Sequence, residues 1–312
     1  MKHLFIVNPV AGGHDSTELV SARVAQAFSG REEDFEIYTT RAPMDAADKI
    51  RYEAAQCDAL RVYACGGDGT LNECVCGAVG QANVAVTHFP TGTGNDFIKT
   101  FGAEGERFRS IADLLAGEVR PLDVIDCNGR SAINICSVGI DARIGTDVHK
   151  YSAIPVIGGA TGYVTSLAVN LAKGIKDELR VVCGGKLYRG EMTLICCCNG
   201  SYYGGGFHPV PEARPDDGLL DFQLVKGVSR LTFLKVVGGY AKGKYADYPD
   251  LITHLRSTEM TIESEKELVV NVDGEALHAN SVRFRLLPGA VNFLVPANMD
   301  YFRAKDAETA AV

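Results

Sequence analysis

The first 90 residues alternate between short apolar runs and longer segments in which apolar residues recur every three or four positions. Short apolar runs that end in Gly, Pro or Asn predict β-strands, whereas the longer periodic segments predict amphipathic helices. The predicted strands are residues 4–7, 35–38, 59–64 and 84–86, and the predicted helices are residues 16–28, 44–56 and 71–79. Strands that alternate with helices in this way predict a parallel, doubly wound α/β sheet, which binds ligands beyond the carboxyl ends of its strands.

After about residue 122 the long helices give way to short segments in which apolar and polar residues alternate, as in residues 282–286 (VRFRL). This alternation is typical of antiparallel strands with one buried face. The predicted strands are residues 132–135, 179–182, 192–198, 219–225, 260–262, 268–272, 282–286 and 291–295, with one serine-capped helix at residues 229–241. We therefore predict an α/β domain of residues 1–122 and an antiparallel, sandwich-like all-β domain of residues 123–289. Residues 290–312 are expected to pack back on the first domain.

The composition narrows the class of protein. A chain of 312 residues with 46% hydrophobic residues can bury the cores of two domains. Its formal net charge of -8, without a Lys/Arg block, argues against a nucleic-acid partner and against strong electrostatic attachment to anionic membranes, although a local patch stays open. The short apolar run at the N-terminus reads as a strand and not as a signal peptide, so we expect a cytosolic protein.

Residues 151–171 are the least charged region. Their Pro, paired Gly, Ser, Thr and Asn residues favour a glycine-rich loop leading into a partly buried helix over a membrane span. The ten cysteines contain no two C-x-x-C motifs at zinc spacing, so we expect reduced, buried thiols and no metal bound by cysteine.

Three predicted strands run into glycine-rich turns, here called the glycine loops: residues 8–13 (NPVAGG), 66–70 (GGDGT) and 90–96 (PTGTGND). A single glycine pair of this kind is usually an ordinary turn between a strand and a helix. Three of them at the ends of neighbouring strands would lie side by side and predict a binding edge.

The glycine loops suit phosphate, because their backbone N–H groups point outward beside helix N-termini. The Walker A spacing and the G-x-G-x-x-G fingerprint are both absent. Asp68 would repel a phosphate unless a divalent cation lay between them, and Mg²⁺ commonly binds one or two carboxylates together with phosphate oxygens. The Thr70 hydroxyl and the Asn72 amide add polar contacts on the following helix.

A second acidic motif, Asp273-Gly274-Glu275, follows the predicted strand 268–272. An Asp-Gly pair is common in hairpin turns, so a structural role is one interpretation. Phosphoryl transfer to an alcohol, however, needs a group that accepts or orients the hydroxyl proton and a metal that neutralises phosphate charge. Two carboxylates separated by one glycine could divide these tasks.

These motifs together resemble a known family. Residues 66–70 resemble the nucleotide motif shared by the diacylglycerol kinase and sphingosine kinase catalytic domain, NAD kinase and phosphofructokinase. Residues 8–13 and 92–97 (GTGNDF) resemble the lipid kinases among these, and residues 202–207 (YYGGGF) and 215–221 (PDDGLLD) resemble second-domain motifs of the soluble bacterial diacylglycerol kinases. The resemblance spans nearly the whole chain in the expected order, and it implies an NAD kinase- or phosphofructokinase-like first domain.

The resemblance implies that ATP is the co-substrate and that Mg²⁺ is required. The implied ATP-binding residues are Asn8, Pro9, Val10, Ala11, Gly12, Thr40, Gly66, Gly67, Asp68, Gly69, Thr70, Leu71, Asn72, Thr91 and Asn95. It also implies Asp273 as the general base and Glu275 as a Mg²⁺ ligand together with Asp68, and the spacing leaves an exchange of these two roles open.

The resemblance further implies a structural Mg²⁺ loop formed by the Asp217 carboxylate and the carbonyls of Arg214 and Leu219. The cationic side chain of Arg214 argues against a bound cation there, and a tight turn before a strand is the alternative. Asp96 and Asp123 match positions that support the catalytic metal. A helix cap is the alternative for Asp96, and a loop acid is the alternative for Asp123. His208 is interpreted as an ordinary hydrogen-bonded histidine.

The sequence therefore predicts a cytosolic lipid kinase that transfers the γ-phosphoryl group of ATP to a lipid hydroxyl, with diacylglycerol as the preferred acceptor and phosphatidic acid as the product. Contact with the inner face of the membrane is expected to be peripheral and transient, through a surface that the sequence does not locate. A sphingoid-base kinase, an NAD kinase and a nucleotide-binding regulator without catalytic activity are the alternatives. Assembly as a homodimer stays open.

Overall fold

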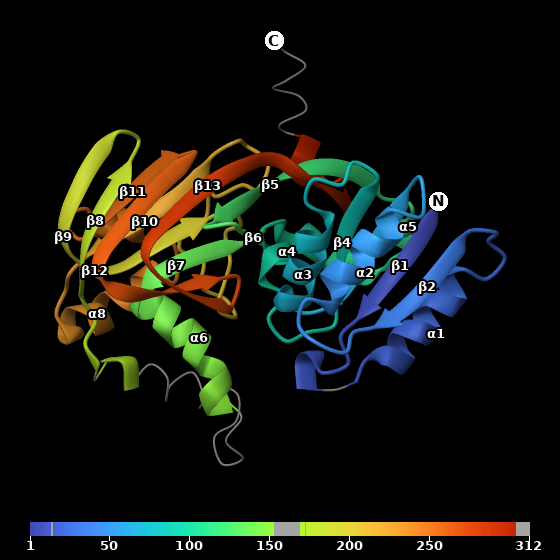
Figure 1. The fold of residues 1–312 in the computed structure, drawn as a ribbon, viewed down its shortest axis with the longest axis horizontal. Coiled ribbons are helices and arrows are strands. Elements are labelled where there is room, and N and C mark those ends of the chain that lie inside the picture. Colours follow the sequence, from blue (N-terminus) through green and yellow to red (C-terminus); the bar gives the residue numbers. More distant parts are fainter. Residues whose placement is uncertain (14, 153–168, 172, 304–312) are drawn as a thin grey trace, which may run out of the picture. The chain divides into compact units, whose positions relative to one another are not determined.

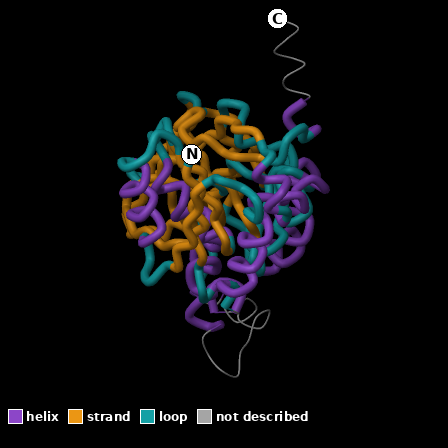
Figure 2. Tube along the Cα trace, turned by 90° about the vertical axis from the view of Figure 1, so that its right-hand side faces the viewer, coloured by secondary structure: helices purple, strands orange, loops and turns teal. Residues whose placement is uncertain are grey.

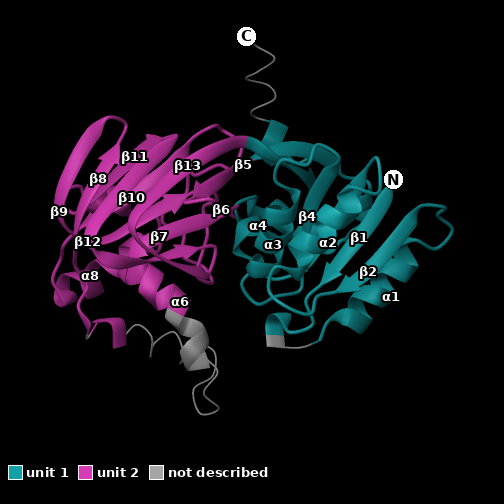
Figure 3. Ribbon diagram, in the orientation of Figure 1, with its two compact units in different colours: residues 1–122, 289–312 teal, residues 123–288 magenta. Residues whose placement is uncertain are grey.

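The computed structural model describes residues 1–13, 15–152, 169–171 and 173–303 (Figure 1). The chain divides into two compact units (Figure 3). Unit 1 consists of Met1–Leu122 and Gly289–Val312, and unit 2 consists of Asp123–Pro288. Strands are the main component of the described fold (Figure 2).

Unit 1 contains the parallel sheet, in the strand order β2-β1-β3-β4-β13. Its strands are β1 (Lys2–Val7), β2 (Asp34–Thr39), β3 (Leu60–Gly66), β4 (Val84–Pro90) and the last residues of β13 (Glu275–Val295). Strand β13 joins the sheet beyond β4, where Asn292 lies opposite Ala85. The predicted doubly wound α/β fold is confirmed.

The helices of unit 1 connect these strands. They are α1 (Thr17–Ala27), α2 (Asp45–Ala54), α3 (Asp68–Ala78), α4 (Asp96–Lys99) and α5 (Ile111–Leu115), with 3-10 turns at Ala11–Gly13 and Gly102–Arg109. Aromatic rings tie the C-terminal segment into the core, since Phe293 contacts Phe97 and both Tyr301 and Phe302 contact Phe101.

Unit 2 is an antiparallel β-structure in the order β11-β10-β9-β7-β12-β13, and β8 pairs with both β9 and β12. Its strands are β5 (Glu118–Cys127), β6 (Arg130–Ala132), β7 (Ile135–Gly139), β8 (Asp177–Cys183), β9 (Lys186–Cys198), β10 (Leu220–Lys226), β11 (Ile252–Ser257), β12 (Glu259–Val272) and most of β13. One buried cluster includes Phe222 and Phe284, and a second includes Tyr203 and Tyr240. The predicted sandwich-like all-β class is confirmed.

Several predicted elements differ from the structure. The predicted strand 132–135 is a break between β6 and β7, because the N–H groups of residues 133–135 bind a carboxylate and not a neighbouring strand. The predicted strands 260–262 and 268–272 are parts of β12, whose pairing with β13 shifts register between Glu263 and Leu268. The predicted strands 282–286 and 291–295 likewise belong to the single strand β13.

Helices α6 (Ile140–Ser152) and α8 (Arg230–Tyr240) belong to unit 2, residues 169–171 are also helical, and Tyr245–Asp247 form a 3-10 turn. Helix α8 confirms the predicted serine cap, since the Ser229 side chain accepts a hydrogen bond from the N–H of Thr232. Helix α6, like β5 and β11, was not predicted. Most of the segment 151–171 lies outside the described residues, so the predicted loop and helix there stay a prediction. Among the helices that are described, none combines the length and the hydrophobicity needed to cross a bilayer.

The prediction that all ten cysteines are reduced and buried is confirmed in part. All ten are free thiols and eight are buried, whereas Cys57 and Cys76 are partly exposed.

Candidate functional site

The three glycine loops are in direct contact in unit 1. The N–H groups of Thr91 and Gly92 both donate to the Gly66 carbonyl, at 2.9 and 3.0 Å. A Cβ atom on Gly92 would lie 2.5 Å from the Cα of Gly67, and one on Gly12 would lie 2.9 Å from the Thr91 carbonyl oxygen. Only glycine permits such close approach of two backbones. The predicted side-by-side arrangement of the loops is confirmed.

Side chains and backbone groups near the glycine loops also contact one another at the carboxyl ends of the parallel strands. The Asn8 amide donates to the Thr70 hydroxyl at 3.2 Å and accepts the N–H of Val10 at 3.1 Å. Thr40, directly after β2, donates its N–H to the Val7 carbonyl at 2.9 Å, so it lies at the end of β1. Residues from four strand ends therefore meet at the carboxyl edge of the parallel sheet, which is where such folds bind ligands.

Asp68 begins α3 and reaches across to the third glycine loop. Its Oδ1 accepts the N–H of Phe97 at 3.1 Å. Its Oδ2 lies 3.0 Å from the position that a Cβ on Gly94 would occupy, and Oδ2 of Asp96 lies 3.8 Å from that same position. A side chain at Gly94 would therefore crowd Asp68, and both carboxylates lie close to Gly94.

This arrangement corrects one interpretation. Asp96 does not cap a helix that starts near Phe97, because α4 itself begins at Asp96 and the carboxylate that accepts the Phe97 N–H belongs to Asp68. Oδ1 of Asp96 instead pairs with Lys99 at 2.5 Å.

The two carboxylates near Gly94 have the chemistry to hold a divalent cation. Mg²⁺ binds carboxylate oxygens and keeps several waters, and Oδ2 of Asp68 and Oδ2 of Asp96 both lie close to Gly94. The buried Oδ1 atoms of Asn72 and Asn95 have no hydrogen-bond partner within the described chain. Asn72 lies on α3, which begins at Asp68, and Asn95 directly precedes Asp96, and buried acceptors of this kind are typical of a site that holds a ligand or ordered water.

His88 contacts the backbone of the second glycine loop. This role was not predicted from the sequence. It is fully buried in β4, and its Nε2 lies 3.1 Å from the Gly66 carbonyl. Burial lowers the pKa of His88, so the neutral imidazole donates from Nε2 to that carbonyl. The only hint in the sequence is one histidine within the apolar run VAVTHFP.

In unit 2, Asp273 and Gly274 form the two-residue turn between β12 and β13, with Val272 opposite Glu275. Both turn residues have positive φ, 46° and 98°, as a type I′ hairpin turn requires. The hairpin interpretation of this motif is therefore confirmed as its conformation, and Glu275 is exposed at the start of β13.

The Asp273 carboxylate is bound by the break between β6 and β7. Oδ2 accepts the N–H groups of Ile133 and Asn134 at 2.7 and 3.1 Å, and Oδ1 accepts the N–H of Ile135 at 2.7 Å. These donors occupy three of the roughly four lone-pair sites of a carboxylate. The bonds hold Asp273 in one orientation and tie the β12–β13 turn to residues 133–135.

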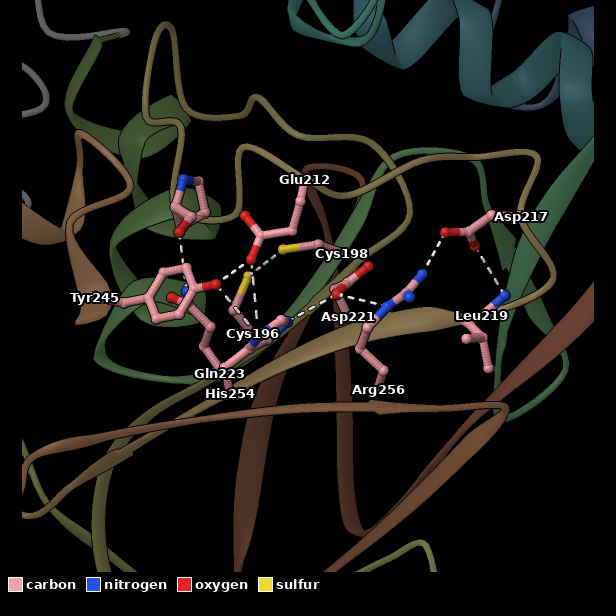
Figure 4. Close-up of polar contacts among 11 residues, drawn as sticks. Cys196, Cys198, Glu212, Asp217, Leu219, Asp221, Gln223, Tyr245, His254 and Arg256 are labelled. Carbon is pink, nitrogen blue, oxygen red and sulfur yellow. Dashed lines mark hydrogen bonds and ion pairs between the residues drawn. The ribbon is translucent and has the colours of Figure 1, made fainter. Parts of the chain in front are cut away.

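In the loop around Asp217, the side chain of Arg256 supplies a positive charge next to the carboxylate (Figure 4). One Asp217 oxygen accepts the Leu219 N–H at 3.0 Å, and the other forms an ion pair with the guanidinium of Arg256. Arg256 also contacts Oδ1 of Asp221 at 3.2 Å, and the side chain of Arg214 pairs with Asp216. With the Asp217 carboxylate neutralised by Arg256, this arrangement does not fit the implied structural Mg²⁺.

Asp123 supports the same loop. It lies within β5 and not in a loop; its carboxylate accepts the Gly218 N–H at 2.8 Å, and its own N–H donates to the Pro215 carbonyl at 2.7 Å. His208 stacks on the ring of Tyr202, with the two ring centroids 3.8 Å apart. Within the described chain, no group of three or more His, Cys, Asp or Glu side chains is placed to hold a metal ion.

Comparison with known proteins covers both units. Residues 2–127 match the family model described as the diacylglycerol kinase catalytic domain, and residues 134–295 match the YegS C-terminal NAD kinase beta sandwich-like domain. The chain is 30% identical to a probable lipid kinase YegS-like protein of Pseudomonas aeruginosa, over 98% of each chain. It is 26% identical to a diacylglycerol kinase of Bacillus subtilis, over 88% of this chain and 90% of the relative.

Comparison with solved structures also finds a similar protein. A putative diacylglycerol kinase from Bacillus anthracis superposes with a TM-score of 0.74 and 26% sequence identity, covering 96% of this chain and 98% of the other.

Proposed function

Because the chain belongs to the lipid kinase family that combines the diacylglycerol kinase catalytic domain with the YegS C-terminal domain, we propose that it transfers the γ-phosphoryl group of ATP to the hydroxyl of a lipid alcohol. The preferred acceptor is diacylglycerol, which would give phosphatidic acid for phospholipid biosynthesis. Since such acceptors reside in bilayers, the proposal includes transient, peripheral contact with a membrane.

The observation that carries this proposal is the contact of the three glycine loops, which brings the carboxylates of Asp68 and Asp96 close to Gly94. Backbone N–H groups of the loops would bind the phosphates of ATP, and Asn8 to Gly12 and Thr40 would border the rest of the nucleotide. Asp68 would hold Mg²⁺, with Asp96 beside it. The bound Mg²⁺ would neutralise phosphate charge as the γ-phosphoryl group leaves.

The acids of unit 2 would act on the acceptor. Asp273 is our candidate for the general base, since its hydrogen bonds to the N–H groups of residues 133–135 hold the carboxylate in one orientation. Glu275 is the candidate Mg²⁺ ligand. Glu275 is exposed at the start of β13, so the exchanged assignment is tested alongside.

Transfer is tested by incubating the purified protein with labelled ATP and Mg²⁺. Mixed micelles supply diacylglycerol or sphingosine, and NAD is offered in a parallel reaction. We expect label in the diacylglycerol product. Label in sphingosine would reassign the lipid acceptor, label in NAD would reassign the enzyme to NAD kinase, and ATP binding without any labelled acceptor would indicate a nucleotide-binding regulator.

Variants separate the roles of the acids. Asp68→Asn and Glu275→Gln should both weaken Mg²⁺-dependent ATP binding, whereas Asp273→Asn should retain it and lose transfer. The base is identified by the pH profile of the residual activity, because removing the base removes the acidic limb. Since Asp273 also anchors residues 133–135, its variant is compared with the wild type at equal folded fraction. Wild-type turnover of Asp273→Asn would refute its assignment as base.

A further inference from the structure

Helix α8 is apolar on two faces, and only one of them is covered. Phe233, Val236 and Tyr240, at helical spacing, pack on the buried cluster of unit 2. On the opposite side, Leu231 and Leu234 are 73% and 52% exposed. They lie three positions apart and therefore share one face of the helix. An apolar helix face open to solvent in this way points to a binding surface.

The surroundings of this face are strongly cationic. Residues 222–246 contain five cationic side chains and no Asp or Glu, in a chain whose net charge is -8. The five, all exposed, are Lys226, Arg230, Lys235, Lys242 and Lys244. Among the residues that the structure describes, the four lysines make no ion pair, whereas Arg230 donates to the Leu171 carbonyl at 2.6 Å. The nearest acids that follow are Asp247 and Asp250.

We propose that the exposed face of α8 and its flanking lysines, here called the α8 surface, docks the protein on an anionic lipid bilayer. The two leucines would enter the boundary between headgroups and acyl chains, and Lys235, Lys242 and Lys244 would lie at the level of the phosphates. Each such lysine adds to the attraction between the protein and an anionic surface. The lysines lie around a small apolar patch and make no ion pair within the described chain. They therefore complement the phosphates of lipids better than they would complement an uncharged groove on another protein. This inference rests on the proposed lipid kinase function, because it places the enzyme where its acceptor resides.

The negative net charge makes this docking selective for one face. The chain as a whole is repelled by an anionic bilayer, so a local cationic surface would orient the molecule as it binds. Helix α8 is seen at the lower left of unit 2 in Figure 1.

The test measures sedimentation of the full-length protein with vesicles, without ATP. Vesicles of equal parts phosphatidylglycerol and phosphatidylcholine are compared with pure phosphatidylcholine, at low and high salt. We expect binding to the anionic vesicles only, weakened by salt. The variants Leu231→Ser/Leu234→Ser and Lys235→Glu/Lys242→Glu should each reduce vesicle partitioning by roughly tenfold or more.

The β8–β9 turn offers a matched control, because Lys186 and Leu187 are both exposed in the same unit and Leu187 is 49% exposed. Lys186→Glu and Leu187→Ser should leave partitioning within about twofold of the wild type, since that turn lies outside the α8 surface. Equal partitioning of wild type and α8 variants, or no vesicle binding by the wild type, would overturn the proposal. Self-association abolished by the leucine variant would assign the surface to a second copy of this chain and overturn it too.

Kinase assays on a short-chain diacylglycerol dispersed as monomers keep the two proposals apart. The α8 variants should phosphorylate it at the wild-type rate, because α8 carries none of the proposed catalytic residues. If vesicle binding depends on α8 but no lipid is labelled, docking stands and the lipid kinase function fails. If lipid is labelled and vesicle binding is independent of α8, the function stands and docking fails.

Discussion

Single residues at the carboxyl edge of the parallel sheet show how closely backbone packing and ligand binding are linked. Gly92 approaches Gly67 so closely that a side chain on Gly92 would disturb the other loop, whereas a Cβ on Gly67 would lie at an ordinary 3.6 Å from the Gly92 Cα. The geometry that requires glycine at this position also brings together the loops that we propose bind phosphate.

Gly92→Ala tests this link. Its Cβ would lie 2.5 Å from the Gly67 Cα, so the loops must separate. We expect a stability loss of about 1–3 kcal/mol, as for other overpacked sites, together with loss of ATP binding. Chemical denaturation and calorimetric ATP titration measure the two effects. Gly69→Ala is the control for stability, because its Cβ would meet nothing within 4 Å. ATP binding by Gly92→Ala at wild-type affinity would contradict the assignment of the loops.

His3 predicts a pH dependence of stability. It is buried in β1, with Nδ1 2.9 Å from the Tyr63 hydroxyl, and burial lowers the pKa of His3 from 6.5 to about 4. The unfolded chain therefore binds more protons than the folded one between these values. Stability from this group is complete above pH 6.5 and is lost as the pH falls toward 4.

We expect this histidine alone to cost about 2 kcal/mol between pH 7 and pH 5. Urea denaturation of the wild type and of His3→Gln at the two pH values measures the difference, and the variant should lose less stability on acidification. His88, whose pKa is also lowered by burial, contributes in the same direction in both proteins, so it does not affect the comparison. Equal acid sensitivity would refute the prediction for His3.

At the scale of elements, strands β10 and β11 are joined by charges as well as by their backbones. Asp221 of β10 lies opposite Arg256 of β11 and also accepts a bond from His254 at 2.7 Å (Figure 4). Asp221 is 1% exposed, and the Arg256 guanidinium that neutralises it reaches on to Asp217. Arg256 of β11 thus links this strand both to β10, through Asp221, and to the loop before β10, through Asp217.

Arg256→Gln should expose this dependence. It leaves Asp217 and Asp221 without their shared cation, and we expect a stability loss of about 1–3 kcal/mol because Arg256 is itself partly exposed. Mg²⁺ should recover part of the loss, since the Asp217 carboxylate is then available to a cation, and Asp217→Asn/Arg256→Gln should show no recovery. Thermal unfolding with and without Mg²⁺ measures both. Stabilisation of the wild type by Mg²⁺ that depends on Asp217 would show that the loop binds metal beside Arg256.

At the scale of the whole molecule, the first unit is built from both ends of the chain. The last residues of β13 pair with β4, and Phe293, Leu294 and Val295 are buried in unit 1. Residues 1–122 therefore contain the glycine loops but lack one strand of the sheet that positions them.

We expect residues 1–122 alone to unfold without a cooperative transition and to bind no ATP, because the β4 edge and its apolar residues are uncovered. Joining residues 289–303 to this fragment by a flexible linker should restore both properties. Circular dichroism during heating and ATP titration are the measurements. Cooperative unfolding of residues 1–122 alone would show that the C-terminal strand is dispensable.

Local sequence was sufficient for the features that depend on near neighbours. The alternation of strands and helices, the glycine loops and the Asp273-Gly274 turn all follow from side-chain period and from the φ angles that glycine and Asp-Gly pairs adopt. Asp68 stood out because an acid within glycines has few local explanations. These predictions depend on only a few consecutive residues, so a single sequence is sufficient to make them.

Features that join distant residues needed the folded chain. Phe97 as the partner of Asp68, residues 133–135 as partners of Asp273, and Arg256 as partner of Asp217 are separated by 29 to 140 positions. Nothing in the local pattern encodes such pairs, because they arise where strand register and core packing bring segments together. The same holds for the burial of His88 and for the exposed face of α8, since helical spacing shows which residues share a face but not which face the core covers.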